Sequence, residues 1–187
     1  MTPAAASLVG PLEAVQRVLG RFDDQGMVIG GVAASLLGRP RLTFDIDALI
    51  LLSTDDVPGL IEAAAREGLV PRISDAESFA REHRVLLLRH VESGIPVDIS
   101  LGMLPFEKEA VERSTLRDTG TFAVRLPTVE DLIILKAVAH RPTDLLDIQA
   151  LIETNPDLDR EWIRSRICEF AEALDMPDLW TDIAAWL

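Results

Sequence analysis

Several features that define other classes of protein are scarce or missing in this 187-residue sequence. Cysteine occurs once, at Cys168, which excludes an internal disulfide and fits a reducing compartment. No apolar run approaches the roughly 20 residues that a membrane-spanning helix needs. The first residues lack the basic region of a signal peptide. We therefore expect a cytoplasmic protein with no membrane segment.

Basic side chains are also in deficit, because 18 Lys and Arg stand against 31 Asp and Glu, for a formal net charge of −13. Nucleic-acid binding depends largely on neutralising phosphates, so a broad basic surface is not expected. The most basic stretch contains Arg72, Arg81, Arg84 and Arg89. It either steers an anionic acceptor or forms local ion pairs with acidic neighbours such as Glu77.

Hydrophobic residues make up 48% of the chain, which is enough for a sizeable core. Up to residue 126, β-rich runs alternate with helical spacing, and from residue 127 the pattern is helical throughout. The sequence thus predicts an α+β fold in one compact unit, with a core at 1–126 and a helical part at 127–187. Strands are predicted at Met27–Ile29, Phe44–Leu52, Arg84–Val91, Ile95–Ile99 and Thr121–Leu126. Helices are predicted at 8–22, Val32–Leu37, Asp55–Glu67, Pro105–Glu112, Val129–His140, after a cap at Thr143 or Asp144, and near Asp159–Leu174 and Asp178–Leu187.

Three aspartates interrupt apolar strand patterns. Asp45 and Asp47 lie two residues apart on a predicted strand, so their side chains should project to the same face. Asp98 lies between apolar neighbours on another predicted strand. Crowded carboxylates repel each other unless a cation lies between them, and oxygen ligands suit Mg²⁺ or Mn²⁺. The alternative is that these acids are strand ends exposed to solvent.

A pair of glycines, Gly30 and Gly31, separates a predicted strand from a predicted helix. Glycine lets a phosphate approach the backbone, and a helix N-terminus attracts anions. Ser35, one turn into the helix, would add a hydroxyl. Arg41 and Thr43 lead into the aspartate strand, from the side where a triphosphate would lie. An ordinary strand-to-helix turn and a plain loop are the alternatives.

Lys136 is surrounded by apolar residues on a helix that is apolar on all sides, which predicts burial. A buried ammonium needs an anionic partner. That partner is either a phosphate or one of the nearby carboxylates of Asp144 and Asp147. These two aspartates also suit the N-cap and N3 positions of the next helix, where they would bond to its N–H groups.

The string GGVAASLLGRPRLTFDID resembles the Gly-Gly and Asp-x-Asp signature of the DNA polymerase β superfamily of nucleotidyltransferases, and in particular the minimal AbiEii-like toxins. The segment around Asp98 is similar to the strand of the family's third carboxylate, and residues 126–148 resemble a later conserved stretch. One departure is Thr143, where these relatives often have Lys. The resemblance covers residues from about 27 to 151.

The resemblance implies a nucleotidyltransferase fold, with a mixed sheet flanked by helices, that transfers a nucleoside monophosphate from an NTP to an acceptor hydroxyl. Asp45, Asp47 and Asp98 would be the catalytic metal ligands. The nucleotide-binding residues would be Gly30, Gly31, Ser35, Arg41, Thr43, Lys136 and Asp147. The acceptor would be RNA or tRNA, and an antitoxin would be a partner. The alternatives are an enzyme that modifies a protein or small molecule, and a relic of the fold that binds a nucleotide or partner without turnover.

Overall fold

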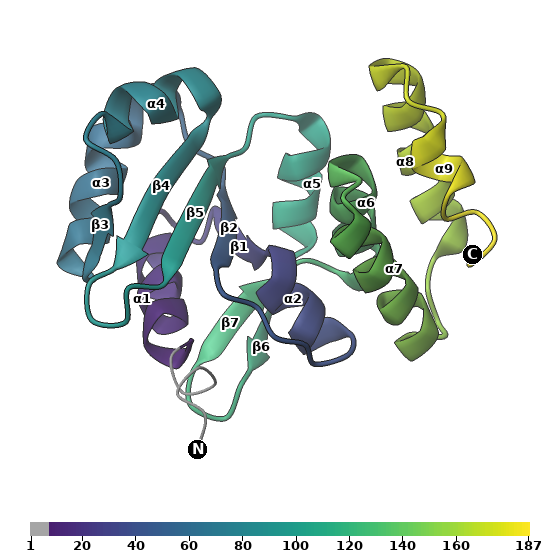
Figure 1. Ribbon diagram of the computed structural model, residues 1–187, viewed down its shortest axis with the longest axis horizontal. Coiled ribbons are helices and arrows are strands. Elements are labelled where there is room, and N and C mark those ends of the chain that lie inside the picture. Colours follow the sequence, from purple (N-terminus) through teal and green to yellow (C-terminus); the bar gives the residue numbers. More distant parts are fainter. Residues whose placement is uncertain (1–7) are drawn as a thin grey trace. The chain divides into compact units, whose positions relative to one another are not determined.

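The structure, a computed structural model, describes residues 8–187 (Figure 1). The chain divides into two compact units. The first, the sheet unit, contains residues 8–32 and Leu42–Leu126, and the second, the helical unit, contains Ala33–Arg41 and Pro127–Leu187. The helical unit therefore takes a short segment from the first quarter of the chain in addition to the C-terminal residues.

A five-stranded mixed sheet forms the centre of the sheet unit, with the strand order β1-β2-β5-β4-β3. Only β2 and β5 run parallel among these strands, and the other neighbouring pairs are antiparallel. The strands are β1 (Gly26–Ile29), β2 (Ile46–Ile50), β3 (Leu69–Pro71), β4 (Val85–His90) and β5 (Pro96–Leu101). The parallel pair lies in the middle, so residues on β2 and β5 are neighbours although about 50 positions separate them in sequence.

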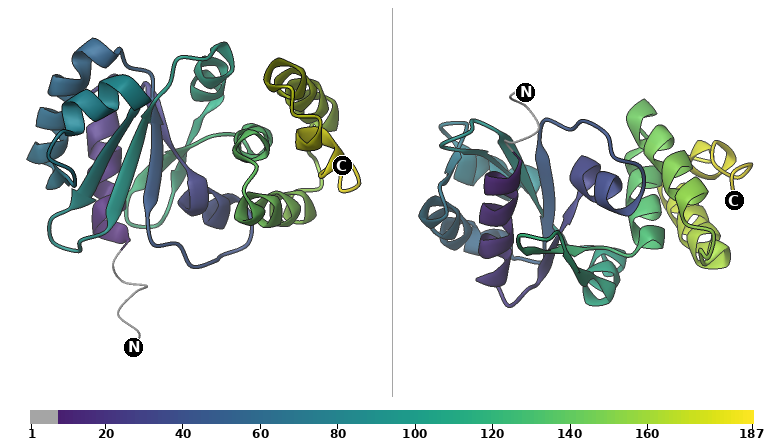
Figure 2. Two further views of the ribbon diagram at one scale, coloured as in Figure 1. Left: turned by 45° about the horizontal axis from the view of Figure 1, so that its top comes forward. Right: turned by 90° about the horizontal axis from the view of Figure 1, so that it is seen from below.

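Three helices pack on one face of this sheet (Figure 2). They are α1 (Val9–Gly20), α3 (Val57–Arg66) and α4 (Ala76–His83), with the short 3-10 turn η1 (Thr54–Asp56) before α3. The strands alternate, so that Leu86, Leu88, Val97 and Ile99 are fully buried whereas their neighbours Leu87 and Asp98 are only half-buried. The face opposite to the helices is therefore the one on which polar side chains emerge.

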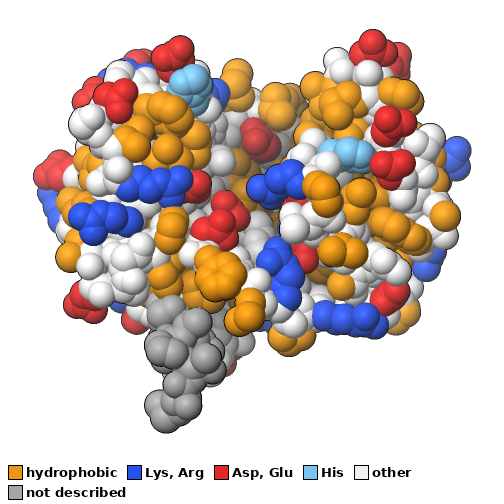
Figure 3. Space-filling model, in the orientation of Figure 1, with side chains coloured by type: hydrophobic (Ala, Val, Ile, Leu, Met, Phe, Trp, Pro, Cys, Tyr) orange, Lys and Arg blue, Asp and Glu red, His pale blue; other side chains and the backbone are white. Residues whose placement is uncertain are grey.

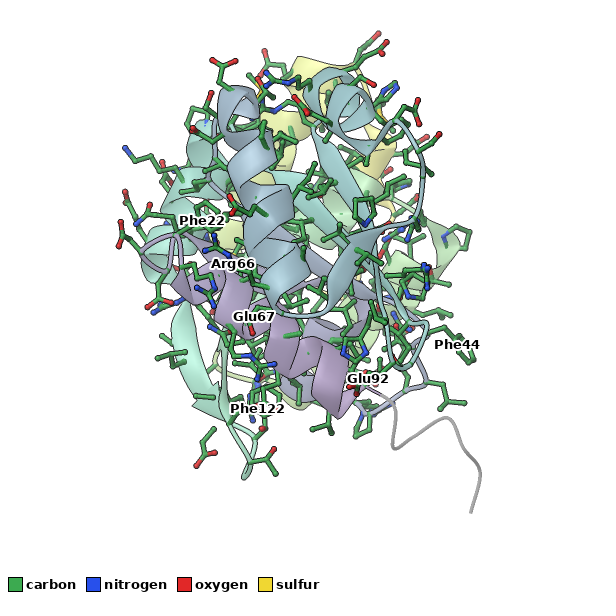
Figure 4. The ribbon with its side chains drawn as sticks, turned by 90° about the vertical axis from the view of Figure 1, so that its left-hand side faces the viewer. Phe22, Phe44, Arg66, Glu67, Glu92 and Phe122 are labelled. Atoms are coloured by element: carbon green, nitrogen blue, oxygen red, sulfur yellow. The ribbon has the colours of Figure 1, made fainter. Side chains whose placement is uncertain are left out.

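An ion pair joins two of these helices. Glu67, directly after α3 and labelled in Figure 4, accepts hydrogen bonds from Arg17 on α1 at 2.6 Å and from Arg21, which directly follows α1. The bonds from Arg21 and Arg17 lower the pKa of Glu67 and outweigh burial, which acts in the opposite direction. Glu67 thus stays ionised and links α3 to α1.

The sheet unit ends with α5 (Pro105–Arg113) and a hairpin of β6 (Thr115–Asp118) and β7 (Ala123–Leu126), which form a separate two-stranded sheet. The helical unit contains α6 (Val129–Ala139), α7 (Pro142–Thr154), α8 (Arg160–Leu174) and α9 (Asp178–Thr181). The helix α2 (Gly30–Leu37) begins in the sheet unit and continues into the helical unit. Among residues 8–187, no helix is both long and apolar enough to cross a bilayer.

The strands predicted at Arg84–Val91 and Ile95–Ile99 are confirmed as the antiparallel pair β4 and β5. The helix predicted at Val129–His140 is confirmed as α6, and Thr128 Oγ1 caps it by accepting a bond from the Asp131 N–H at 3.1 Å. The cap predicted for α7 is wrong, because Arg141 occupies the N-cap and Asp144 lies at N3. The N-cap of α3 is Asp56, which makes no side-chain capping bond, and Ser53 caps the preceding turn η1 by accepting a bond from the Asp55 N–H. Strand β3 and helix α4 were not predicted.

Candidate functional site

Asp47 and Asp98 lie side by side in the middle of the sheet. They are direct partners in the parallel register of β2 and β5. Partners in register project to the same face of a sheet, about 5 Å apart at the backbone. Both residues are half-buried, on the face opposite to α1, α3 and α4. The fold thus brings together two of the three predicted carboxylates, from positions 51 residues apart in sequence.

Asp45 lies just outside the strand, and the prediction that it shares a strand with Asp47 is wrong. The strand begins at Ile46, and Phe44 and Asp45 form a bend before it. Thr43 Oγ1 donates a hydrogen bond to Asp45 Oδ1 at 2.9 Å, which closes this bend. Phe44 is 72% exposed and projects away from the body of the sheet unit (Figure 4). Thr43 therefore lies beside Asp45 and orients its carboxylate.

The first glycine of the pair lies against Asp47. Ile29 is the register partner of Asp47, and helix α2 begins directly at Gly30, with no intervening loop. Gly30 has a φ of +64°, and a Cβ at this position would lie 1.9 Å from Asp47 Oδ2. Only glycine combines this backbone conformation with so close an approach. Gly31 follows as a buried residue in the first turn of α2.

An arginine absent from the predicted site contacts Asp98. Arg72 Nη2 donates to Asp98 Oδ2 at 3.1 Å, and Arg72 Nη1 lies 2.7 Å from Oδ1. Arg72 follows β3, and its N–H donates to the Leu87 carbonyl at 3.1 Å. Leu87 is in turn the register partner of Asp98. The basic character of this stretch was visible in the sequence, but the pairing depends on the position of β3, which was not predicted.

The carboxylates of Asp45, Asp47 and Asp98 carry oxygen atoms of the kind that bind a hard divalent cation. Oδ1 of Asp98 is buried and lies 2.7 Å from Arg72 Nη1, so a cation that binds this oxygen has to replace the guanidinium. Carboxylate oxygens are the ligands that Mg²⁺ and Mn²⁺ prefer. Among residues 8–187, no three His, Cys, Asp or Glu side chains already converge as a metal-holding group. The residue types fit such a cation, which would have to displace Arg72 from Asp98 and Thr43 from Asp45.

Lys136 lies in a buried charge network of the helical unit. Its Nζ lies 3.0 Å from Asp144 Oδ1 and 2.7 Å from Asp147 Oδ2, and all three side chains are at most 6% exposed. Arg141 Nε donates to Asp144 at 2.6 Å, and Arg41 binds both oxygens of Asp147 at 2.6 and 2.8 Å. Burial alone would raise the pKa of Asp144 and Asp147, but the bonds from the arginines and Lys136 lower both pKa values below normal.

Ser35 and Arg41, which were predicted to bind the nucleotide, make contacts that stabilise the segment after α2. Ser35 Oγ donates to the Arg41 carbonyl at 3.2 Å and lies 3.4 Å from the Arg41 N–H. Arg39 pairs with Glu153 at 2.9 Å, and Asn155 Nδ2 donates to the Leu37 carbonyl at 3.0 Å. Ser35, Arg41 and Asp147 thus have defined structural partners within the helical unit. Their predicted contacts with a nucleotide stay predictions.

The basic side chains visible in Figure 3 form no continuous patch among the described residues on that face. On the face shown in Figure 3, Lys and Arg of the described residues lie scattered among acidic and hydrophobic side chains. Within the basic stretch, Arg81 pairs with Glu77 and Asp55, and Arg84 donates to the Leu101 carbonyl at 2.9 Å. Arg81 thus forms the local ion pair that the second alternative for this stretch expects, whereas Arg84 binds a backbone carbonyl and Arg72 pairs with Asp98.

Comparisons with known proteins agree on the fold. A family model described as "Nucleotidyl transferase AbiEii toxin, Type IV TA system" matches residues 14–179. An antigenic nucleotidyltransferase-like protein from Paracoccidioides brasiliensis is similar in structure, with a TM-score of 0.56 and 14% identity over 95% of this chain and 94% of that chain. The antibiotic-resistance factor ANT(2'')-Ia is also similar, with a TM-score of 0.55 and 15% identity over 90% of this chain and 95% of that chain. No curated protein matches the sequence significantly. The predicted nucleotidyltransferase fold is confirmed.

Proposed function

Because the chain belongs to the AbiEii nucleotidyl transferase toxin family of type IV toxin–antitoxin systems, we propose that it transfers a nucleoside monophosphate from an NTP to an acceptor hydroxyl and releases pyrophosphate. The observation that carries this proposal is the register pairing of Asp47 with Asp98, beside a glycine whose missing side chain leaves room at Asp47. Two neighbouring carboxylates on an open sheet face provide ligands for the divalent cation that such a transfer uses.

Each acidic residue would have its own task. Asp45 and Asp47 would hold Mg²⁺ or Mn²⁺ on the nucleotide side, and Asp98 would hold it on the acceptor side. When bound, the cation supplies charge neutralisation for the triphosphate and activation of the attacking hydroxyl. Once Arg72 has left it, the carboxylate of Asp98 would promote deprotonation of the acceptor hydroxyl. Catalysis would then consist mainly of positioning and electrostatics.

The start of α2 would bind phosphate. Gly30 and Gly31 form its first turn, where N–H groups and the positive end of the helix dipole favour an anion. Because Gly30 lies against Asp47, phosphate bound there would be adjacent to the carboxylates. Thr43 would support the same end of the site by orienting Asp45.

RNA or tRNA is the first candidate acceptor, since the family is one of toxins within toxin–antitoxin systems. The net charge of −13 favours the second, a protein or small molecule, because an acidic surface repels a nucleic acid. On the same family membership we propose a cognate antitoxin as a partner, and the cytoplasm as the place of action. If expression of this chain stops cell growth, co-expression of the antitoxin should restore growth.

The test of the proposed reaction is transfer of label. The protein is incubated with NTPs labelled at the α-phosphate, Mg²⁺ and a cell lysate, and labelled products are then digested with ribonuclease or with protease. Label lost only with ribonuclease identifies an RNA acceptor, and label lost only with protease identifies a protein. Labelled product that resists both enzymes identifies a small-molecule acceptor, and no labelled product together with full NTP binding would support the alternative of a relic without turnover.

Substitutions assign the carboxylates. The double variant Asp45→Asn with Asp47→Asn should lose Mg²⁺-dependent NTP binding and keep its fold. Asp98→Asn should lower kcat far more than NTP affinity, because its interaction strengthens in the transition state. Asp56→Asn is the matched control, since Asp56 is exposed and makes no side-chain capping bond. Tight Mg²⁺–NTP binding by the double variant would show that the metal site is elsewhere.

A further inference from the structure

We propose that Arg72 is a positioning residue that competes with the divalent cation for Asp98. This inference rests on the proposed function, since it concerns the metal that the transfer would use. The guanidinium lies along the carboxylate of Asp98, with Nη1 2.7 Å from Oδ1 and Nη2 3.1 Å from Oδ2. Both oxygens of the acceptor-side ligand are therefore engaged by one arginine.

The sheet itself holds Arg72 in this position. Its backbone N–H donates to the Leu87 carbonyl, directly after β3. Leu87 is the register partner of Asp98 on the neighbouring strand β5. The arginine and the carboxylate are thus fixed relative to each other by strand pairing, whereas a surface pair on two flexible loops would not be.

The electrostatics explain why an arginine is needed there. Asp47 and Asp98 are adjacent carboxylates on one face, and without a cation they repel each other. The guanidinium supplies positive charge to one of them. An Mg²⁺ or Mn²⁺ ion binds carboxylate oxygen at about 2.0–2.1 Å, so it and the guanidinium cannot share one edge of Asp98 without strong repulsion.

Exchange between the two cations is feasible because neither partner is sealed from solvent. The side chain of Arg72 is 29% exposed and that of Asp98 is 30% exposed. A metal ion that arrives with a nucleotide can therefore displace the guanidinium to solvent. The consequence is that Arg72 lowers the affinity of the nucleotide-free site for metal and holds the carboxylate of Asp98 in place until the ion arrives.

Direct Mn²⁺ binding to the nucleotide-free protein tests this competition. Free Mn²⁺ is measured by electron paramagnetic resonance at constant ionic strength, for wild type and Arg72→Gln. The variant should bind Mn²⁺ more tightly, with a Kd about three- to tenfold lower, the range for a half-exposed ion pair with hydrogen bonds. Arg72→Lys keeps the charge but loses the two-point contact, so its Kd should lie between the two.

Two controls separate competition from a general change of charge. Arg89→Gln removes the same charge from an exposed position on β4, two residues beyond Leu87, and should change Kd less than about twofold because solvent screens it. In an Asp98→Asn background, Arg72→Gln should have no effect on Kd, because the contested carboxylate is gone. Circular dichroism melts of every variant show that each one is folded.

The outcomes distinguish this inference from the proposed function. Unchanged or weaker Mn²⁺ binding by Arg72→Gln, a gain equal to that of Arg89→Gln, or a gain that persists in Asp98→Asn would each overturn the competition and leave the metal site standing. Binding of Mn²⁺ by neither wild type nor Arg72→Gln, with or without NTP, would overturn both proposals.

Discussion

Replacement of Lys136 by methionine tests the buried charge network most directly. Methionine keeps most of the apolar stem and removes the ammonium that lies between Asp144 and Asp147. Removal of one partner from a buried ion pair costs about 3–5 kcal/mol, because a charge is left uncompensated. Each carboxylate here keeps an arginine, so we expect the lower end, about 3 kcal/mol. In a chain of this length that corresponds to a fall in Tm of about 6–12 °C.

The pH dependence of the loss follows from the lowered pKa values of both aspartates. A carboxyl whose folded pKa is lowered stabilises the fold above its ordinary pKa, which is 3.8 here, and that stabilisation is lost as pH falls through the folded pKa. The difference between wild type and Lys136→Met should therefore be full at pH 7 and shrink in acid, where the stranded carboxylates become protonated.

Urea denaturation at pH 7 and at steps towards pH 3 measures both effects. Lys108→Met is the matched control, because Lys108 is exposed on α5, and its loss should change stability by less than about 0.5 kcal/mol. Melts with and without Mg²⁺–NTP then test the predicted nucleotide contact. Equal stability of Lys136→Met and Lys108→Met at pH 7 would refute the reasoning. A destabilised Lys136→Met with a full NTP-induced shift would exclude Lys136 from phosphate binding.

Three further changes have defined outcomes. Gly30→Ala should lower stability in melts and abolish nucleotidyl transfer, because the added Cβ would meet Asp47. The control Gly59→Ala should change neither quantity, because its Cβ meets nothing within 4 Å. Glu67→Gln should cost about 0.5–1 kcal/mol at pH 7 in urea. Because the folded pKa of Glu67 is lowered, the unfolding free energies of Glu67→Gln and wild type should converge as pH falls below the ordinary pKa of 4.5. Asp147→Asn should lower the unfolding free energy in urea by about 2–3 kcal/mol, because Lys136 and Arg41 lose the carboxylate that they share. A variant as stable as wild type would contradict the network.

The sequence was informative where local pattern decides structure. The apolar surroundings of Asp98 and of Lys136 correctly indicated a strand residue with limited exposure and a buried ammonium. The acidic partners of Lys136 were among the alternatives, because they lie only 8 and 11 residues after it, on the next predicted helix. The Gly-Gly pair before a helix was visible as well, since it depends on neighbouring residues only.

What the sequence could not show depends on contacts between distant segments. The register that pairs Asp47 with Asp98 is set by parallel strands, and no turn joins such strands to fix their alignment. Arg72 could not be assigned because β3 has only three residues, too few for a periodic pattern. The strand limit at Ile46 was missed since Phe44 is a strong β-former, although its side chain is exposed.

The segment Ala33–Arg41 belongs to the helical unit, although it lies between two strands of the sheet unit. Arg41 is bonded to Asp147 across 106 residues, and Leu37 to Asn155 across 118. On a ribosome that adds about 5–20 residues per second, Arg41 would emerge roughly 5–20 s before the carboxylate that binds it. The backbone leading to Asp45 can therefore acquire its final hydrogen bonds only near the end of synthesis. In nascent chains, and in chains truncated before α7, the backbone that precedes Asp45 should not be ordered. Any activity should therefore arise only once α7 has been made.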